Sequence, residues 1–245
     1  FFQAEDGIRD VAVTGVQTCA LPIYFAQWPV PVVFVPGNHE FDGRDVDTAL
    51  ADLRGLASEL GLILLDQDTV TLTGPQGERV RFVGCTRWCD FNLFGEQQRP
   101  RAMRAASYFV KVMKATVAGQ PFDPEAVRAR ALDARAWLAR TLQTPPTEAA
   151  DATVVITHYG PSLRSADPRY GGQPGTASFC NADDDLLPFA DLWVHGHLHC
   201  RHDYRVAHAR GDTRVLSNAR GHGHKRESDG FDGRLTCDVG AASCN

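Results

Sequence analysis

The sequence predicts an α/β (α+β) sandwich with helices on the outside. Two patterns predict this fold class. Short apolar runs rich in β-branched residues indicate strands, and they alternate with longer segments whose apolar residues recur at helical spacing. The 245 residues, 43% of them hydrophobic and 22% charged, suit one large globular domain or at most two. A disordered or collagen-like chain is excluded by this composition.

Turn and cap residues mark the first elements. Val30–Val35 is an apolar run before a Pro-Gly pair, so we expect a buried strand followed by a tight turn. Asp45–Leu60 has the apolar spacing of a helix, and Gly61 is a typical residue to end it. The next expected strands, the last two of them a hairpin, are Leu62–Leu65, Thr69–Thr73 and Arg79–Val83.

The second half of the chain continues the alternation. Helices are expected over Arg101–Val117 and Pro124–Leu142, the second with Asp123 as its N-cap. A short helix is expected over Asp183–Phe189, where Asp183–Asp185 would cap the helix and complement its dipole. The remaining expected strands are Thr153–Thr157, Asp191–Val194, Tyr204–Ala207 and Thr213–Leu216.

Residues 1–24 differ from the rest of the chain. They show no strand or helix periodicity, and they lack the basic start and long apolar core of a signal peptide. Gln3–Asp10 and Val13–Ile23 resemble the constant parts of a translated sequencing-library adapter, with Val11-Ala12 where a variable index would lie. We therefore expect residues 1–24 to be non-native and the domain to span residues 25–245, the alternative being a genuine irregular arm.

Charge and cysteine content narrow the class of partner. The formal net charge of −5 provides no broad basic field, which argues against long nucleic acids. No apolar run approaches the ~20 residues of a membrane span, so no membrane contact is expected. Seven cysteines without a CxxC pair fit a reducing compartment, and a cytoplasmic location is the default expectation.

Three of the expected strands lead directly into side chains that commonly bind metal ions. These side chains are Asn38 and His39 after the first strand, His158 after the second, and His195, His197 and His199 after the third. In α/β sheets, binding sites gather at the carboxyl ends of the strands. Imidazole nitrogen and amide oxygen suit a borderline divalent cation such as zinc, manganese or iron.

The same residues resemble the motifs of the calcineurin-like metallophosphoesterase superfamily. The matching motifs are GNHE at Gly37–Glu40, the histidine that ends VVITH at His158, and GHLH at Gly196–His199, in the family's order. Further segments of the sequence, including TRWCDFNLFG and SNARG, are similar to those of a bacterial group of predicted phosphohydrolases. The resemblance implies two facing β-sheets flanked by helices, with a helical insertion over residues about 84–150 beside the cleft.

The resemblance also implies the roles of the site residues. Asn38, His158 and His197 would bind the second of two divalent metal ions (Mn, Fe or Zn), and His199 would bind the first. His39 would lie beside the phosphate, where it stabilises charge or protonates the leaving oxygen. The implied reaction is hydrolysis of a phosphomonoester or phosphodiester in a small substrate by a metal-activated hydroxide.

The sequence departs from the family pattern in one respect. The D-x-H and G-D motifs, which would supply the first metal's other ligands and the bridging aspartate, are absent between Phe25 and Gly37. Gly211-Asp212 lies after GHLH and is assigned to a turn. We therefore expect a chain that lacks the first strand–helix–strand portion of the sheet, with an incomplete first metal site and impaired activity. The alternative is a non-catalytic metal-binding or scaffold protein that kept the fold without a complete dinuclear site.

Other polar and aromatic residues allow two interpretations each. Glu40 is either a general base or a residue with a hydrogen-bonding role in its loop, and Cys200, which follows His199, could be a soft metal ligand. His195 is expected to support the ligands or pack rather than to bind metal. Trp88, Phe91 and Phe94 would either cover the cleft or pack against the inserted helices. Arg99, Arg101 and Arg104 would face an anionic substrate or solvent, and Cys85, Cys89 and Cys180 are expected in the core.

Overall fold

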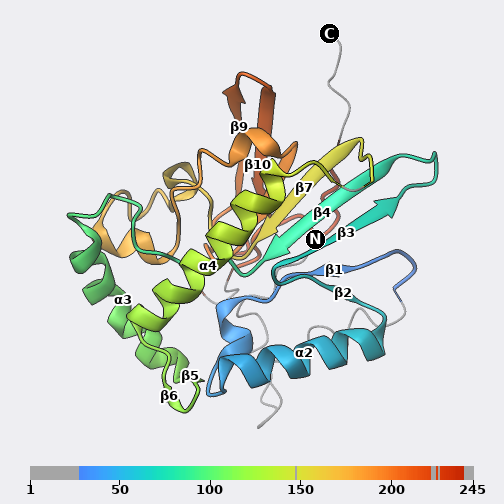
Figure 1. Ribbon diagram of the computed structural model, residues 1–245. Helices are drawn as coiled ribbons and strands as arrows, with labels where there is room; N and C mark the ends of the chain where they lie inside the picture. The colour runs from blue at the N-terminus through green and yellow to red at the C-terminus, as the bar shows by residue number, and fades with distance from the viewer. Residues whose placement is uncertain (1–27, 147, 222–224, 226, 240–245) are drawn as a thin grey trace.

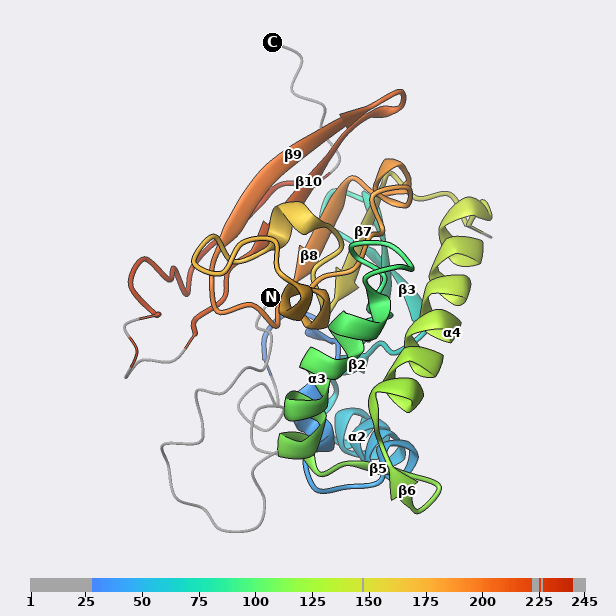
Figure 2. The ribbon, with the colours of Figure 1, turned by 90° about the vertical axis from the view of Figure 1, so that its left-hand side faces the viewer.

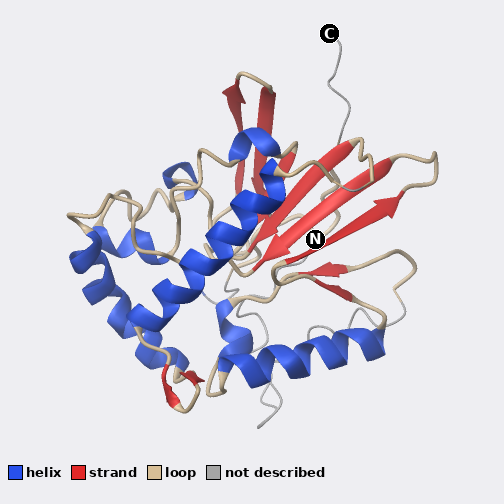
Figure 3. Cartoon of the chain, in the orientation of Figure 1, coloured by secondary structure: helices blue, strands red, loops and turns tan. Residues whose placement is uncertain are grey.

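The computed structural model describes residues 28–146, 148–221, 225 and 227–239. The adapter-like segment 1–24 lies outside the described residues. The chain forms a six-stranded sheet with helices along two sides (Figures 1 and 3). The helices are α2 (Val46–Leu60), α3 (Arg99–Met113) and α4 (Pro124–Gln143), joined by the 3-10 helices η1 (Asn38–Phe41), η2 (Leu163–Ser165), η3 (Pro174–Ser178) and η4 (Leu187–Phe189).

The six-stranded sheet has the order β3-β4-β7-β8-β10-β9, with parallel pairing in its centre and an antiparallel hairpin at each edge. Its strands are β3 (Asp68–Thr73), β4 (Arg79–Cys85), β7 (Ala152–Thr157), β8 (Leu192–His195), β9 (His202–His208) and β10 (Gly211–Ser217). The β9–β10 hairpin projects beyond the rest of the sheet (Figure 2). Parallel pairing in the centre brings the carboxyl ends of β4, β7 and β8 to one edge of the sheet.

A second, smaller sheet faces the first. It consists of β1 (Val33–Phe34) and β2 (Ile63–Leu64), which pair in parallel, and α2 lies beyond them (Figure 1). Val35 and Leu65 pack with Val154, Ile156 and other apolar residues from one face of the six-stranded sheet. The two facing sheets that the sequence led us to expect are therefore present.

The opposite face of the large sheet is covered by α4. The apolar side of this helix contributes Ala134, Leu138 and Leu142, which pack against residues that include Val155 and Trp193. The segment between β4 and β7 thus contains α3, α4 and, between them, a small hairpin of β5 (Thr116–Val117) and β6 (Gln120–Pro121).

The predicted N-cap Asp123 and the predicted helix end at Gly61 are confirmed, and Asp45, which was predicted to lie within the helix, is instead the N-cap of α2. The Asp45 side chain accepts hydrogen bonds from the backbone N–H groups of the first turn of α2, and Gly61 ends the helix in the left-handed conformation with φ 70°. The Asp123 side chain accepts a hydrogen bond from the Ala126 N–H at 2.9 Å at the start of α4. These signals are local in sequence, so they could be identified without the fold.

Three element predictions are corrected. Helix α3 ends at Met113 rather than at Val117, because Lys114 adopts a left-handed conformation (φ 52°) and the chain then enters β5. Only Leu187–Phe189 of the expected short helix is helical. Gly211 and Asp212 belong to β10 and pair with His208 and Ala207, so they are not a turn.

Candidate active site

Five predicted site residues follow three strands. Asn38 and His39 open η1 just after β1, His158 directly follows β7, and His197 and His199 lie in the loop after β8. Strands β7 and β8 are parallel neighbours, and β1 lies in the facing sheet. The site therefore forms where the carboxyl ends of strands from both sheets meet.

Three of these residues are in mutual contact. The Nε2 atom of His158 lies 2.7 Å from Oδ1 of Asn38 and 3.1 Å from Nδ1 of His197. The third edge of the triangle, between His197 Nδ1 and Asn38 Oδ1, measures 3.0 Å. We call Asn38, His158 and His197 the ligand triad.

The environment of His197 decides which ring nitrogen faces the triad. Its Nε2 lies 3.2 Å from the carbonyl oxygen of Ser178, which can only accept a hydrogen bond. In the neutral ring the proton is therefore on Nε2, and Nδ1 presents a lone pair to the triad. The ring lies between Tyr159 and Phe179, with centroid distances of 4.2 and 5.0 Å. His197 also has a φ of 64°, a left-handed backbone conformation that is uncommon for a residue other than glycine.

The triad is suited to a cation. The Asn38 oxygen and the His197 Nδ1 lone pair both accept, and the Nε2–H of His158, 2.7 and 3.1 Å from them, donates to both. Without that proton, all three atoms would present lone pairs to one point, where a positive charge would be favourable. His158 is 1% exposed, and burial holds its pKa well below the ordinary value, with a further contribution from the neighbouring histidines. A neutral imidazole is the form that binds metal. One amide oxygen and two neutral imidazoles are thus a donor set that could hold one divalent cation.

Gly37 and Glu40 shape the backbone beside the triad. A Cβ atom on Gly37 would lie 2.6 Å from Cε1 of His158, so only glycine allows this close approach. The buried Glu40 carboxylate accepts a hydrogen bond from the Gly37 N–H at 2.5 Å. This is the loop hydrogen bond that was one of the two interpretations of Glu40.

His39 and His199 each contact a carboxylate. The Nδ1 atom of His39 lies 2.8 Å from Oδ2 of Asp42, and Nδ1 of His199 lies 2.9 Å from Oε2 of Glu227. Such contacts fix the tautomer and the ring orientation. Sequence reasoning missed both carboxylates. Asp42 lies in the NHEFDG text and could have been found there, whereas no motif marks Glu227.

A cavity of about 180 Å³ connects the polar residues of the site to an apolar region under α3. Asn38, His39, His197 and His199 all line it, together with Trp88 and other apolar side chains. A second cavity of about 440 Å³ adjoins His197 and His199 and is lined by Arg169 and Lys225 among others. His39 and His199 therefore share a cavity with two members of the triad.

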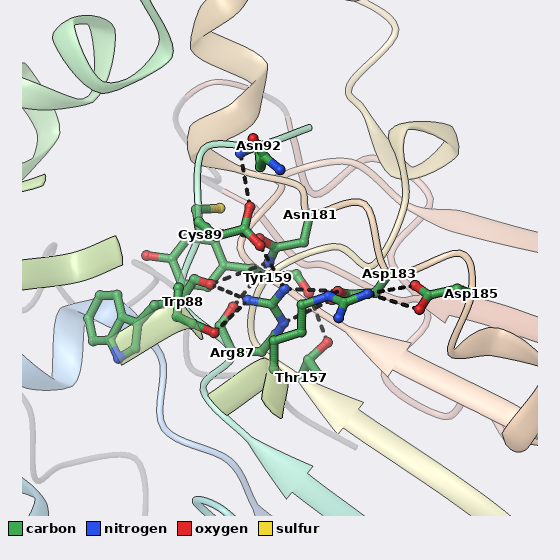
Figure 4. Close-up of polar contacts among 12 residues, drawn as sticks. Arg87, Trp88, Cys89, Asn92, Thr157, Tyr159, Asn181, Asp183 and Asp185 are labelled. Atoms are coloured by element: carbon green, nitrogen blue, oxygen red, sulfur yellow. Dashed lines mark hydrogen bonds and ion pairs between the residues drawn. The ribbon is translucent and has the colours of Figure 1, made fainter. Parts of the chain in front are cut away.

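A buried ion pair holds the segment after β4, which supplies one wall of the cavity. The Arg87 guanidinium, fully buried, binds both oxygens of Asp183 at 2.8 and 2.9 Å and also contacts Asp90 at 3.1 Å (Figure 4). Arg87 Nη1 donates to the Trp88 carbonyl at 2.9 Å. The expectation that Asp183–Asp185 caps a helix is corrected, because Asp183 is the counterion of Arg87 and Asp185 binds Arg135 (Figure 4).

The remaining predicted residues lie outside the ligand triad. Trp88 is buried in the core and also lines the cavity, so both of its interpretations apply. His195 is buried, and burial lowers its pKa to about 3. Cys200 Sγ lies 3.2 Å from His202 Nε2. The core cysteines Cys85, Cys89 and Cys180 are buried as predicted.

Within the described ranges, no three side chains of the histidine, cysteine, aspartate and glutamate types are placed to hold a metal ion together. The triad differs in that its third member is an amide. None of the helices in the described ranges has both the length and the apolar character needed to cross a membrane.

Comparisons with known proteins identify the family and a similar fold. A profile of the calcineurin-like phosphoesterase family matches residues 7–201. No curated protein matches the chain. Phosphopantetheinyl hydrolase (PptH) from Mycobacterium tuberculosis is 16% identical, with a TM-score of 0.58 over 85% of this chain and 78% of that one, and so has a similar fold. A hypothetical protein from Thermus thermophilus, 13% identical over 91% of this chain and 82% of that one, has a TM-score of only 0.32. Because the family profile covers most of the sequence, this chain belongs to the calcineurin-like phosphoesterase family.

Proposed function

We propose that this chain is a metal-dependent hydrolase that cleaves a phosphomonoester or phosphodiester in a small substrate. The observation that carries the proposal is the ligand triad, whose three N and O atoms lie 2.7–3.1 Å from one another at the ends of strands in two sheets. The family membership supports the same chemistry. The similar fold of a protein named as a hydrolase, PptH, is consistent with it.

In this proposal the triad holds one divalent cation, Mn, Fe or Zn, and His199 contributes to a site for a second. When bound, such ions lower the pKa of water and stabilise the charge on the phosphoryl oxygens. The triad itself consists of one amide and two imidazoles, so none of its members carries a negative charge that would offset the charge of a cation. We therefore expect metal binding by this chain to be weak and its activity low.

The chain's own residues position the reacting groups. Tyr159 and Phe179 hold the His197 ring between them, and Ser178 fixes its tautomer. In this proposal His39 donates a proton to a leaving oxygen or stabilises negative charge. Its position at the border of the cavity and its contact with Asp42 support that role.

The lack of a carboxylate in the triad favours a second candidate. A protein that binds one cation through neutral ligands and catalyses nothing would be a metal-binding or scaffold member of the same family. The two candidates predict the same cation site and differ only in turnover.

Calorimetric titration with Mn²⁺ after chelator treatment, followed by assays with p-nitrophenyl phosphate and its bis-ester, tests both candidates. For the hydrolase, we expect Mn²⁺-dependent turnover that is lost, together with metal binding, in Asn38→Ala. Asn92→Ala is the matched control, because Asn92 contacts Arg99 and lies outside the cavity. Metal binding that depends on Asn38 but gives no turnover would favour the scaffold. Metal binding unaffected by Asn38→Ala, or none at all, would refute both.

A further inference from the structure

The cavity beside the triad is polar at one end and apolar everywhere else. Its polar end is formed by the amide and imidazole groups of the site and by Ser178. None of its lining residues within the described ranges is a lysine, arginine, aspartate or glutamate. Its walls include Trp88, Phe91, Val110, Met113, Tyr159 and Phe179.

The apolar walls are held in place by packing. The Trp88 ring contacts Phe41, Phe122 and Tyr159 at centroid distances of 5.5, 5.1 and 5.8 Å. The backbone carbonyl of Trp88 accepts a hydrogen bond from the buried Arg87 (Figure 4). Since most of the apolar lining, including Trp88, Phe91 and Tyr159, belongs to the hydrophobic core, these walls are preformed and a ligand that enters does not have to order them.

The size of the cavity matches a single apolar group. An apolar cavity of about 150 Å³ in another protein stays dry and binds benzene, and this one has a volume of about 180 Å³. A sugar or a second phosphate in this space would leave hydroxyl groups or charges without partners beyond the polar end, which is unfavourable.

The position of His39 indicates which part of a substrate the cavity would take. His39 lines the same cavity as Trp88 and Val110, so a group held against those walls lies next to the imidazole. In the proposed hydrolysis, water supplies the oxygen that bonds to phosphorus, the P–O bond to the alcohol breaks, and the alcohol leaves with a proton. A leaving oxygen on a group held in the cavity would be beside that proton source.

We propose that this cavity is the subsite for the leaving group, and that the preferred substrates are phosphate esters of an apolar alcohol or a phenol rather than of a sugar or nucleoside. This inference rests on the proposed function and adds the substrate class to it. Among the residues that the structure describes, the lining holds no lysine, arginine, aspartate or glutamate, and this observation favours an apolar ester over a nucleotide.

The test uses binding, so that it does not depend on turnover. Phenylphosphonate, methylphosphonate and 2-hydroxyethylphosphonate are titrated calorimetrically into the full chain with Mn²⁺ present. We expect the phenyl compound to bind at least about tenfold more tightly than the other two, because only its ring buries apolar surface. Equal affinities would overturn the proposal.

Two neighbouring alanines of α3 provide a matched pair of variants. Ala106 lines the cavity and Ala105 does not, so Ala106→Leu should remove the preference for the phenyl group while Ala105→Leu keeps it. Val110→Phe fills the same space from a partly buried position and replaces Ala106→Leu if that variant fails to fold. A phenyl preference that survives cavity filling would refute the assignment.

A metal-free measurement separates this inference from the proposed function. Phenol alone should raise the Tm of the unsubstituted chain with increasing concentration and should not raise that of Ala106→Leu. If phenol has this effect but no phosphonate binds, the apolar cavity stands and the proposed function fails. If phosphonates bind without a phenyl preference and phenol has no effect, the proposed function stands and the subsite fails.

Discussion

Replacement of Gly37 by alanine tests the architecture of the triad directly. Gly37 has φ −95° and ψ −178°, a conformation that alanine adopts freely, so any effect comes from the added methyl group and not from backbone strain. The new Cβ would lie 2.6 Å from Cε1 and 2.8 Å from Nδ1 of His158, and 2.9 Å from Oε2 of Glu40. Ordinary contacts between carbon atoms are about 3.5 Å or longer, so the imidazole must retreat by about 1 Å.

That retreat has two consequences. His158 is 1% exposed and packs edge-on against Tyr159, so the ring has little room to move, and we expect the variant to lose about 1–3 kcal/mol of stability through overpacking. The movement also opens the contacts of 2.7 and 3.1 Å that His158 makes within the triad. Displacement of a ligand's support typically lowers metal affinity by about 10–100-fold, and we expect a loss in that range.

The assay is calorimetric titration with Mn²⁺, combined with urea unfolding of the metal-free chain. Gly55→Ala is the control, because Gly55 lies in the middle of α2 and its Cβ would have no neighbour within 4 Å. That substitution should raise stability by about 0.5–1 kcal/mol and leave the metal Kd unchanged. A folded Gly37→Ala variant with the parent's Kd would refute the reasoning, because the triad would then not depend on the close approach.

Two further predictions concern stability. Arg87→Met should cost about 3–5 kcal/mol in urea unfolding, because it removes the one fully buried cation that the buried Asp183 and Asp90 carboxylates share. Arg135→Met, which removes a partly exposed partner of Asp183, should cost far less, and equal losses would contradict the role of Arg87. The buried His195 has a pKa of about 3 in the folded chain against about 6.5 when unfolded, so between these values the unfolded chain takes up a proton that the folded chain does not. The contribution of His195 to the free energy of unfolding is present above pH 6.5 and should therefore decrease by about 2 kcal/mol between pH 7 and pH 5. Urea unfolding at both pH values should show that the free energy of unfolding of His195→Phe changes less between them than that of the unsubstituted chain, by about this amount. An unchanged pH dependence would be evidence against a buried neutral His195.

Local signals in the sequence determined much of the fold. The N-cap Asp123, the terminating Gly61 and the apolar strand runs act through neighbours a few residues away, so their effect can be identified without the fold. The end of α3 could not be found in this way. The strand β5 that follows it is held by Arg44, whose carbonyl oxygen accepts a hydrogen bond from the Thr116 N–H at 2.9 Å, a contact made across the fold.

The candidate site, like the fold, was predictable from the sequence only in part. The residue types at the strand ends indicated a cation site, because the carboxyl ends of strands collect ligands in folds of this class. Only the tertiary structure decided that Asn38, His158 and His197 meet within 3.1 Å, while His39 and His199 contact Asp42 and Glu227. It also decided that Asp183 pairs with Arg87, 96 residues away in the sequence, rather than capping a helix. Contacts of this kind depend on how distant segments pack, whereas caps and periodicity depend only on adjacent residues.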